Sequence, residues 1–371
     1  MHAFTTSRRA IVATANIFIF VACFEGTTAP VNDAAAKSSS GTSAAASALS
    51  GDPSILATPV PITDLGTGKY LTYAGGLYGV GLNTMPAAHA TVGTTRARAV
   101  RPRDATGAPS ASGKIVVLSI GMSNTSQEFC TQLEAGTPPC TNWSFVGRVK
   151  QDPSVNPAVV LVNGAKSFQV AQYWLTPTAP NYNRVRDSVL KTVGLTENQV
   201  QVVWLKVTNL APAVALPAAN ADAVVLEREI GQILRALRVR YPFLKQVFLS
   251  SRIYGGYGGP RLNPEPYAYE TGFSVKWAIG AQITQMVTGA INPTAGDLNY
   301  TTVAPWVAWG PYMWANGSTP RADGLKWVRS SFETDGTHPS QGGEAKVATL
   351  LLNFFKGSPH TACWFLAGRT C

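Results

Sequence analysis

Residues 114–124 read Lys-Ile-Val-Val-Leu-Ser-Ile-Gly-Met-Ser-Asn, an apolar, β-branched run that ends at a glycine and small polar residues. A short run of this kind, bounded by a turn signal, is typical of a buried parallel strand. Similar runs follow at 158–162, 200–207 and 247–250. We therefore expect 114–120 to be the first strand of a mostly parallel sheet.

Amphipathic stretches alternate with these runs. The final stretch covers 340–356, and the clearest, at 222–240, places five apolar residues on one helical face: Leu226, Ile230, Ile233, Leu234 and Leu237. Alternating strands and helices predict an α/β fold of three layers, α/β/α, around a mostly parallel central sheet. In such sheets ligands bind at the carboxyl ends of the strands.

Three of the predicted strands are followed by residues that suit a binding site: Ser123, Gly164 and Asn209. A serine on a tight strand-to-helix turn exposes its hydroxyl, a glycine lets the backbone approach a bound group, and an amide side chain can donate to an oxyanion. Each residue also has an ordinary structural interpretation. Ser123 would then be a helix N-cap, and Gly164 and Asn209 would be turn residues.

An acid–histidine pair, Asp335 and His338, precedes the final helix in the sequence Asp-Gly-Thr-His-Pro. An acid three residues before a histidine can hold the ring Nδ1–H, which leaves Nε2 free to take a proton from a serine hydroxyl. Asp-x-x-His also occurs by chance. The chain has four histidines, however, and only His89 and His360 compete with His338 inside the predicted folded region.

With these residues in this order, the chain resembles the SGNH (GDSL-type) hydrolases over about residues 114–356. The resemblance implies a flavodoxin-like α/β/α fold and an acyl-enzyme mechanism that needs no metal and no organic cofactor. The matching positions are Ser123 for the block I nucleophile, Gly164 for the block II glycine, Asn209 for the block III asparagine, and Asp335 with His338 for block V.

The implied oxyanion hole consists of the backbone N–H groups of Ser123 and Gly164 with the Asn209 side chain. Two motifs depart from the family pattern. Block I has Gly-Met-Ser-Asn rather than Gly-Asp-Ser, a form similar to the Gly-Gln-Ser-Asn of sialate and xylan acetylesterase-like members. Block III normally reads Gly-x-Asn-Asp, and here 207–210 keeps only the asparagine, which makes Asn163 a rival of Asn209.

The resemblance implies a serine esterase that hydrolyses O-acyl esters, foremost O-acetyl esters, of a carbohydrate. The expected partner is an acylated small molecule or polysaccharide. Two alternatives stay open. One is a broad-specificity esterase for lipid-like or polyester substrates, and the other is a non-catalytic polysaccharide-binding protein on the same fold.

Aromatic residues before the Asp-x-x-His motif are candidates for substrate binding: Trp306, Trp309, Trp314, Trp327 and Tyr312. Flat aromatic faces suit sugars or an aromatic acyl group, and the alternative is that these rings fill the core beneath a long loop. Arg252, after the fourth strand, can contact a polar substrate group or form a structural ion pair.

The N-terminal third divides into three predicted segments. Residues 1–22 combine Arg8 and Arg9 with an apolar run and predict an export signal. Residues 23–52 form a tether rich in Ala and Ser, which begins at Cys23, either a lipid-anchor site or part of a discarded signal. Residues 53–113 predict an irregular arm packed on the hydrolase domain at 114–371, because tyrosines stud a stretch with little periodicity.

The localisation we expect is bacterial and exported: periplasmic, cell-surface or extracellular, with membrane contact only through Cys23. The other four cysteines form two close pairs, Cys130/Cys140 and Cys363/Cys371, which predict local disulfides, although other pairings remain open. Residues 1–22 hold two arginines of the 30 Lys and Arg, so the rest carries 28 against 20 Asp and Glu, or +8. This excess forms no basic run, so we expect no nucleic-acid partner.

Overall fold

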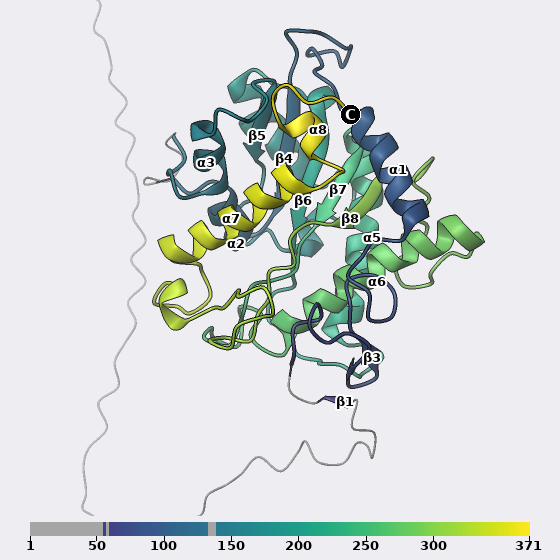
Figure 1. Ribbon diagram of the computed structural model, residues 1–371, viewed down its shortest axis with the longest axis vertical. Helices are drawn as coiled ribbons and strands as arrows, with labels where there is room; N and C mark the ends of the chain where they lie inside the picture. The colour runs from purple at the N-terminus through teal and green to yellow at the C-terminus, as the bar shows by residue number, and fades with distance from the viewer. Residues whose placement is uncertain (1–54, 57–58, 133–138) are drawn as a thin grey trace, which may run out of the picture. The chain divides into compact units, whose positions relative to one another are not determined.

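The computed structural model describes residues 55–56, 59–132 and 139–371 (Figure 1). Its central sheet has five strands in the order β5-β4-β6-β7-β8, and every neighbouring pair is parallel. The strands are β4 (Ile115–Gly121), β5 (Val159–Asn163), β6 (Val200–Lys206), β7 (Gln246–Leu249) and β8 (Trp306–Trp309). Counted along the chain this order is 2-1-3-4-5, the flavodoxin-like order. The predicted fold class is confirmed.

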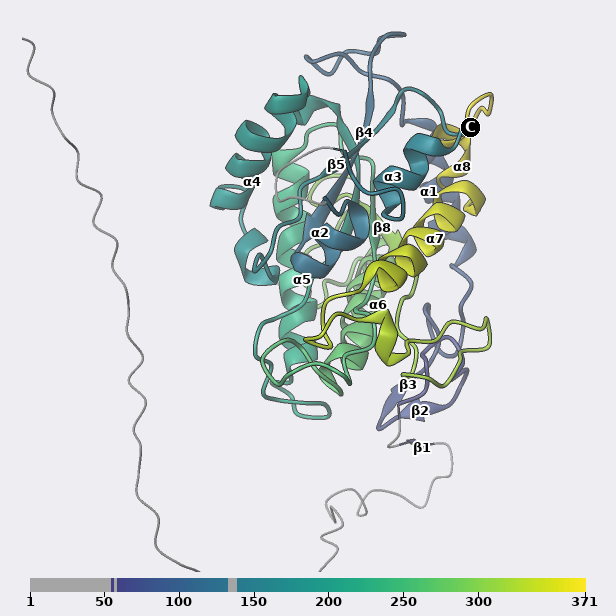
Figure 2. The same ribbon diagram turned by 90° about the vertical axis from the view of Figure 1, so that its left-hand side faces the viewer.

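Helices cover both faces of the sheet, as the side view in Figure 2 shows. One face packs against α4 (Pro180–Arg184), α5 (Asp222–Arg240) and α6 (Tyr267–Thr288). The other packs against α1 (Ala87–Arg98), α2 (Ser123–Phe129), α3 (Phe145–Gln151), α7 (Gln341–Gly357) and α8 (Ala362–Phe365). Alternate strand residues separate the two cores: Leu118 of β4 lies with α5, whereas Val117 lies with α7. Both faces are therefore buried, as an apolar run without polar alternation requires.

Shorter turns complete the chain. They are η1 (Ala171–Trp174), η2 (Val185–Leu190, π-helical), η3 (Lys191–Val193), η4 (Glu197–Gln199) and η5 (Arg329–Ser331). The disulfides Cys130–Cys140 and Cys363–Cys371 are both present, so the predicted pairing is confirmed. Within the described ranges, no helix combines the length and the apolar character that crossing a membrane requires.

The N-terminal arm is more regular than predicted. It contains a small sheet of β1 (Ile55–Leu56), β2 (Lys69–Tyr70) and β3 (Tyr73–Ala74), followed by helix α1. The prediction of an irregular arm is therefore wrong over these elements. Helix α1 could not be predicted from periodicity because its buried positions are His89, Gly93 and Ala97, small or polar residues that leave no apolar stripe. The predicted segments 1–22 and 23–52 lie outside the described residues.

Tyrosines anchor the first part of the arm to helix α6. The ring of Tyr70 packs edge-on against Tyr269 and stacks with Phe273, and its hydroxyl donates to Glu270 at 3.3 Å. Lys276 adds hydrogen bonds from its ammonium group to the Ala74 and Gly75 carbonyls. These contacts make this part of the arm a component of the domain core.

Tyr70→Ala should lower the free energy of unfolding by about 3–5 kcal/mol, because it opens a cavity between the arm and α6. Urea unfolding followed by tryptophan fluorescence measures the change. Thr72→Ala, at an exposed neighbouring position, is the matched control and should change stability by less than about 0.5 kcal/mol. Equal stabilities for the two variants would show that the arm contributes nothing to the core.

A buried carboxyl group on α5 should make stability depend on pH. Burial raises the pKa of Glu227 to about 7. Between about pH 4.5 and 7 the unfolded chain releases this proton while the folded chain keeps it, so stability should fall as pH rises through that window. Glu227→Gln should remove roughly 1–3 kcal/mol of this fall, measured by urea unfolding at pH 5 and pH 8. The exposed Glu333→Gln serves as control, and an unchanged pH slope in Glu227→Gln would contradict the assignment.

Candidate active site

The turn after β4 places Ser123 at the first position of helix α2. A methyl group on Gly121 would lie 2.1 Å from the Lys206 carbonyl oxygen and 2.4 Å from Thr125 Oγ1, so only glycine fits this crossing. Thr125 in turn donates to the same Lys206 carbonyl at 2.6 Å. The serine therefore emerges from β4 at the point where the strand order reverses, between β5 and β6.

Ser123, His338 and Asp335 form a continuous hydrogen-bonded chain. The Ser123 Oγ lies 2.8 Å from His338 Nε2. On the other side of the ring, His338 Nδ1 is hydrogen-bonded to Asp335 Oδ2. The structure thus brings Ser123 together with Asp335 and His338, which lie more than two hundred residues later in the sequence.

The loop that carries Asp335 and His338 is held in shape by its own backbone. Asp335 Oδ1 accepts from the backbone N–H groups of Thr337 and His338, both at 2.9 Å. Although burial raises its pKa, the hydrogen bonds from the His338 ring and from these two amides lower the pKa of Asp335 below its usual value. Gly336 adopts φ +69°, and a methyl group there would lie 1.8 Å from the Tyr257 carbonyl oxygen.

A hydrogen bond joins this loop directly to the serine turn. Asn124, next to Ser123 and buried, donates from Nδ2 to the Thr337 carbonyl at 2.9 Å. The asparagine of the Gly-Met-Ser-Asn motif therefore sets the distance between the serine and the histidine.

A cavity of about 290 Å³ opens at Ser123 and His338. Its other walls come from segments that follow the strands and from α2: Met122, Asn124, Gln127, Ser167, Phe168, Val170, Thr208, Asn209, Leu210, Arg252, Leu262, Asn263 and Thr337. Three apolar residues of this wall, Phe168, Leu210 and Leu262, carried no signal in the sequence. Phe168 is 71 % exposed with φ +63°, an arrangement that a sequence pattern does not reveal.

The structure separates the two rival asparagines. Asn209 lines the cavity, and its side chain hydrogen-bonds the Glu229 carboxylate of α5. Asn163 does not line it: its Nδ2 donates to the Ser126 carbonyl at 3.0 Å, and its Oδ1 accepts from Ser119. Gly164 also lies outside the cavity wall, where its carbonyl accepts from the Arg184 guanidinium. Of these three residues, only Asn209 faces the space beside Ser123.

The prediction that Trp306, Trp309 and Trp314 bind substrate is wrong. Each is at most 4 % exposed, and none lines the cavity. Trp306 and Trp309 belong to the core strand β8, and the Trp314 indole donates to the partly buried Glu265 at 2.7 Å. The alternative interpretation, core filling, is the one that the structure supports. Arg252 behaves differently, because it is 1 % exposed and does line the cavity.

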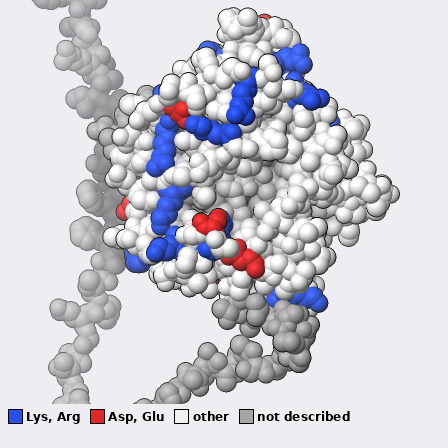
Figure 3. All heavy atoms as spheres, viewed as in Figure 1, with Lys and Arg blue, Asp and Glu red and all other residues white. Residues whose placement is uncertain are grey.

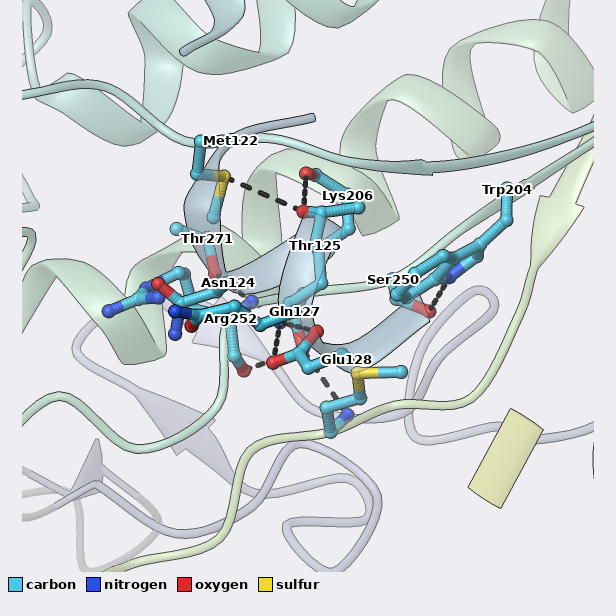
Figure 4. Close-up of polar contacts among 12 residues, drawn as sticks. Met122, Asn124, Thr125, Gln127, Glu128, Trp204, Lys206, Ser250, Arg252 and Thr271 are labelled. Atoms are coloured by element: carbon cyan, nitrogen blue, oxygen red, sulfur yellow. Dashed lines mark hydrogen bonds and ion pairs between the residues drawn. The ribbon is translucent and has the colours of Figure 1, made fainter. Parts of the chain in front are cut away.

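A buried ion pair lies beneath the serine turn. Glu128 of α2 and Lys206 of β6 are fully buried, and the Lys206 Nζ is 2.5 Å from both carboxylate oxygens. Figure 4 shows these side chains with Thr125 and Arg252 around the start of α2. Burial lowers the pKa of Lys206 to about 8, against the opposing effect of Glu128. The pair therefore ties the helix that begins at Ser123 to the neighbouring strand.

The face seen in Figure 3 carries its Lys and Arg side chains in separate groups, with a broad uncharged area beside them. Across residues 55–56, 59–132 and 139–371, no group of three His, Cys, Asp or Glu side chains could hold a metal ion.

The chain is similar to several solved hydrolase structures. One is an extracellular lipase from Streptomyces rimosus (11 % identity, 64 % of this chain and 98 % of that one, TM-score 0.30). Others are a family two carbohydrate esterase from Cellvibrio japonicus (10 %, 65 % and 60 %, 0.34) and a carbohydrate esterase family 2 enzyme from Corynascus thermopiles (11 %, 66 % and 66 %, 0.35). No protein-family model and no curated protein matches the chain. At these TM-scores the similarity supports no conclusion about activity, which has to rest on the site itself.

Lys206→Met should destabilise the fold by about 3–5 kcal/mol, because it leaves the buried Glu128 carboxylate without its partner. Guanidinium unfolding measures the loss. The double variant Glu128→Leu/Lys206→Met should regain much of it, since an apolar pair needs no buried charge. A double variant as unstable as the single one would show that packing, and not the unpaired charge, causes the loss.

Proposed function

We propose that the protein is a serine esterase that acts through an acyl-enzyme. The observation that carries the proposal is the hydrogen-bonded chain from Ser123 Oγ to His338 Nε2 and from His338 Nδ1 to Asp335. A serine hydroxyl 2.8 Å from an imidazole nitrogen, with a carboxylate on the other ring nitrogen, is the arrangement that nucleophilic acyl transfer requires.

In the proposed mechanism His338 takes the proton of Ser123 as Oγ attacks the ester carbonyl, and the carbonyl π electrons move onto oxygen. Collapse of the tetrahedral intermediate expels the alcohol, to which His338 returns the proton. Water then attacks the acyl-enzyme by the same route and releases the acid. Asp335 orients the ring and stabilises the imidazolium without taking the proton itself.

The oxyanion needs donors near Ser123. The first backbone N–H groups of a helix have no intrahelical acceptor, and Ser123 begins α2, so its N–H is available to the oxyanion. Asn209 supplies an amide side chain from the cavity wall. Gly164 stays a weaker candidate, since it does not line the cavity.

For the substrate we propose an ester with a short acyl group, because the cavity of about 290 Å³ is small for a binding site. The finer hypothesis, an O-acetyl ester of a carbohydrate, rests on the Gly-Met-Ser-Asn motif alone. The buried tryptophans give it no support. We also propose that the protein is exported, since two disulfides suit an oxidising compartment. Anchoring at Cys23 remains part of that proposal.

Ser123→Ala should reduce the hydrolysis of p-nitrophenyl acetate by about 10⁴-fold or more, because the variant lacks the nucleophile. The release of p-nitrophenolate at pH 8 measures the rate. Ser112→Ala, in an exposed loop, is the matched control and should retain the full rate.

Equal rates for the protein and Ser123→Ala would exclude Ser123 as the nucleophile. If the folded protein has no Ser123-dependent turnover on acetyl esters of phenols or of sugars, the non-catalytic binding alternative replaces the proposal. Glycan binding that is unaffected by Ser123→Ala would support that alternative directly.

A further inference from the structure

Arg252 is the only fully buried cation in the cavity wall within the described ranges. It follows β7, and its backbone N–H donates to Thr271 Oγ1 at 3.0 Å, which fixes the main chain. Its side chain is 1 % exposed and lines the same cavity as Ser123 and His338. A guanidinium group is protonated at any ordinary pH, so a full positive charge sits in the wall of the candidate active site.

This guanidinium has few hydrogen-bond partners. Its single side-chain bond is a long one, from Nη2 to the Leu262 carbonyl oxygen at 3.4 Å. Nε and Nη1 are buried and have no partner among the residues that the structure describes. A charged donor left unpaired in the interior is strongly unfavourable, so such a group is expected to serve a ligand or a reaction.

Three carboxylates raise the pKa of Arg252, and each of them is already bound by other donors. Glu128 is paired with Lys206. Glu265 accepts from the backbone N–H groups of Gly255 and Tyr269 and from the Trp314 indole. Asp335 holds His338. Burial lowers the pKa of Arg252, and these three carboxylates oppose that effect through space, but in the described part of the chain none forms a hydrogen bond with it.

Other unpartnered polar atoms lie on the same cavity wall. Within residues 55–56, 59–132 and 139–371, buried oxygen atoms of four lining residues have no hydrogen-bond partner: Gln127, Thr208, Asn263 and Thr337. Two of these are hydroxyl groups that can donate. The same wall therefore holds a fixed cation with unpaired N–H groups and two neutral hydroxyls, all of which can donate to a carboxylate, together with two amide oxygens that only accept.

We propose that Arg252 binds a carboxylate of the substrate, so that the ester hydrolysed at Ser123 is an anionic one. This inference rests on the proposed esterase function and names its substrate class. The incoming carboxylate would replace the Leu262 carbonyl, whose 3.4 Å contact is the weakest that the guanidinium makes. Because the guanidinium is 1 % exposed, such a pair is worth more than the same pair at the surface.

The test compares esters that differ only in a carboxylate. 4-Nitrophenyl hemisuccinate against 4-nitrophenyl butyrate places the charge on the acyl side. 4-Acetoxybenzoate against phenyl acetate places it on the alcohol side. With the unaltered protein, one anionic ester should exceed its neutral partner in kcat/KM by about ten- to a hundredfold, and the pair that responds identifies the side on which Arg252 acts.

Variants assign that preference to Arg252. Arg252→Met should abolish the anionic-to-neutral ratio. Arg252→Lys should keep part of it, because the charge remains and the two-pronged geometry is lost. Arg261→Met removes an equal charge from an exposed position outside the cavity wall and should leave the ratio unchanged. A ratio that is equal in the protein and in Arg252→Met would overturn the inference, even where neutral esters are turned over normally.

A binding measurement keeps the inference testable if Arg252→Met does not fold or if no ester is turned over. Calorimetry on Ser123→Ala should show that benzoate or succinate binds with about tenfold higher affinity than benzamide or succinamide. Equal or absent binding of the acids and amides would overturn the carboxylate site. If the protein binds the acids but shows no Ser123-dependent ester hydrolysis, the esterase proposal is overturned and the carboxylate site is retained.

Discussion

Lys206 is the residue on which the rest of the site depends, because it holds the serine turn from two sides. Its backbone carbonyl is the surface against which Gly121 passes and to which Thr125 donates. Its ammonium group reaches the Glu128 carboxylate on the next turn of α2. Both contacts are buried, so α2 cannot rotate or slide without breaking a main-chain contact and separating two charges in the interior. The position of Ser123 therefore depends on the end of β6 as much as on β4, the strand that precedes it.

The sheet was predictable because its strands are buried on both faces. Parallel strands of this kind must be apolar at every position, and a run as short and as β-branched as 114–120 is typical of such a strand. Strand β8 was missed because tryptophan at both of its ends looked like a binding surface. Composition cannot distinguish a ring that faces a helix from a ring that faces a ligand. Helix α6 has buried residues on most of its circumference, so it shows no apolar stripe against a polar face, and periodicity gave no signal.

The candidate site also contains some residues that could be predicted from the sequence and others that could not. Asp335 and His338 could be predicted from the sequence because an acid three residues before a histidine can hydrogen-bond its ring, whatever the surrounding fold. The choice between Asn163 and Asn209 was not accessible, since both follow a strand and only the direction of the side chain separates them. Asn163 uses its amide to join β4, β5 and α2, whereas Asn209 lines the cavity and is hydrogen-bonded to Glu229 of α5. Direction of this kind depends on which helix packs behind the strand, and that is decided by long-range contacts.

The missing hydrogen-bond partners of Arg252 distinguish a ligand-binding role from a purely structural one. A structural ion pair was the ordinary expectation for a buried arginine, and it would have required a carboxylate with free oxygen atoms within reach. The neighbouring carboxylates are already bound by other donors. The guanidinium therefore forms few interactions that could offset the free-energy cost of burying its charge. An apolar side chain of similar volume would suit a position whose only role was packing. A charge kept in the same cavity wall as Ser123, against that preference, is best explained by a ligand that enters the cavity, and a carboxylate accepts the hydrogen bonds that the guanidinium leaves unused.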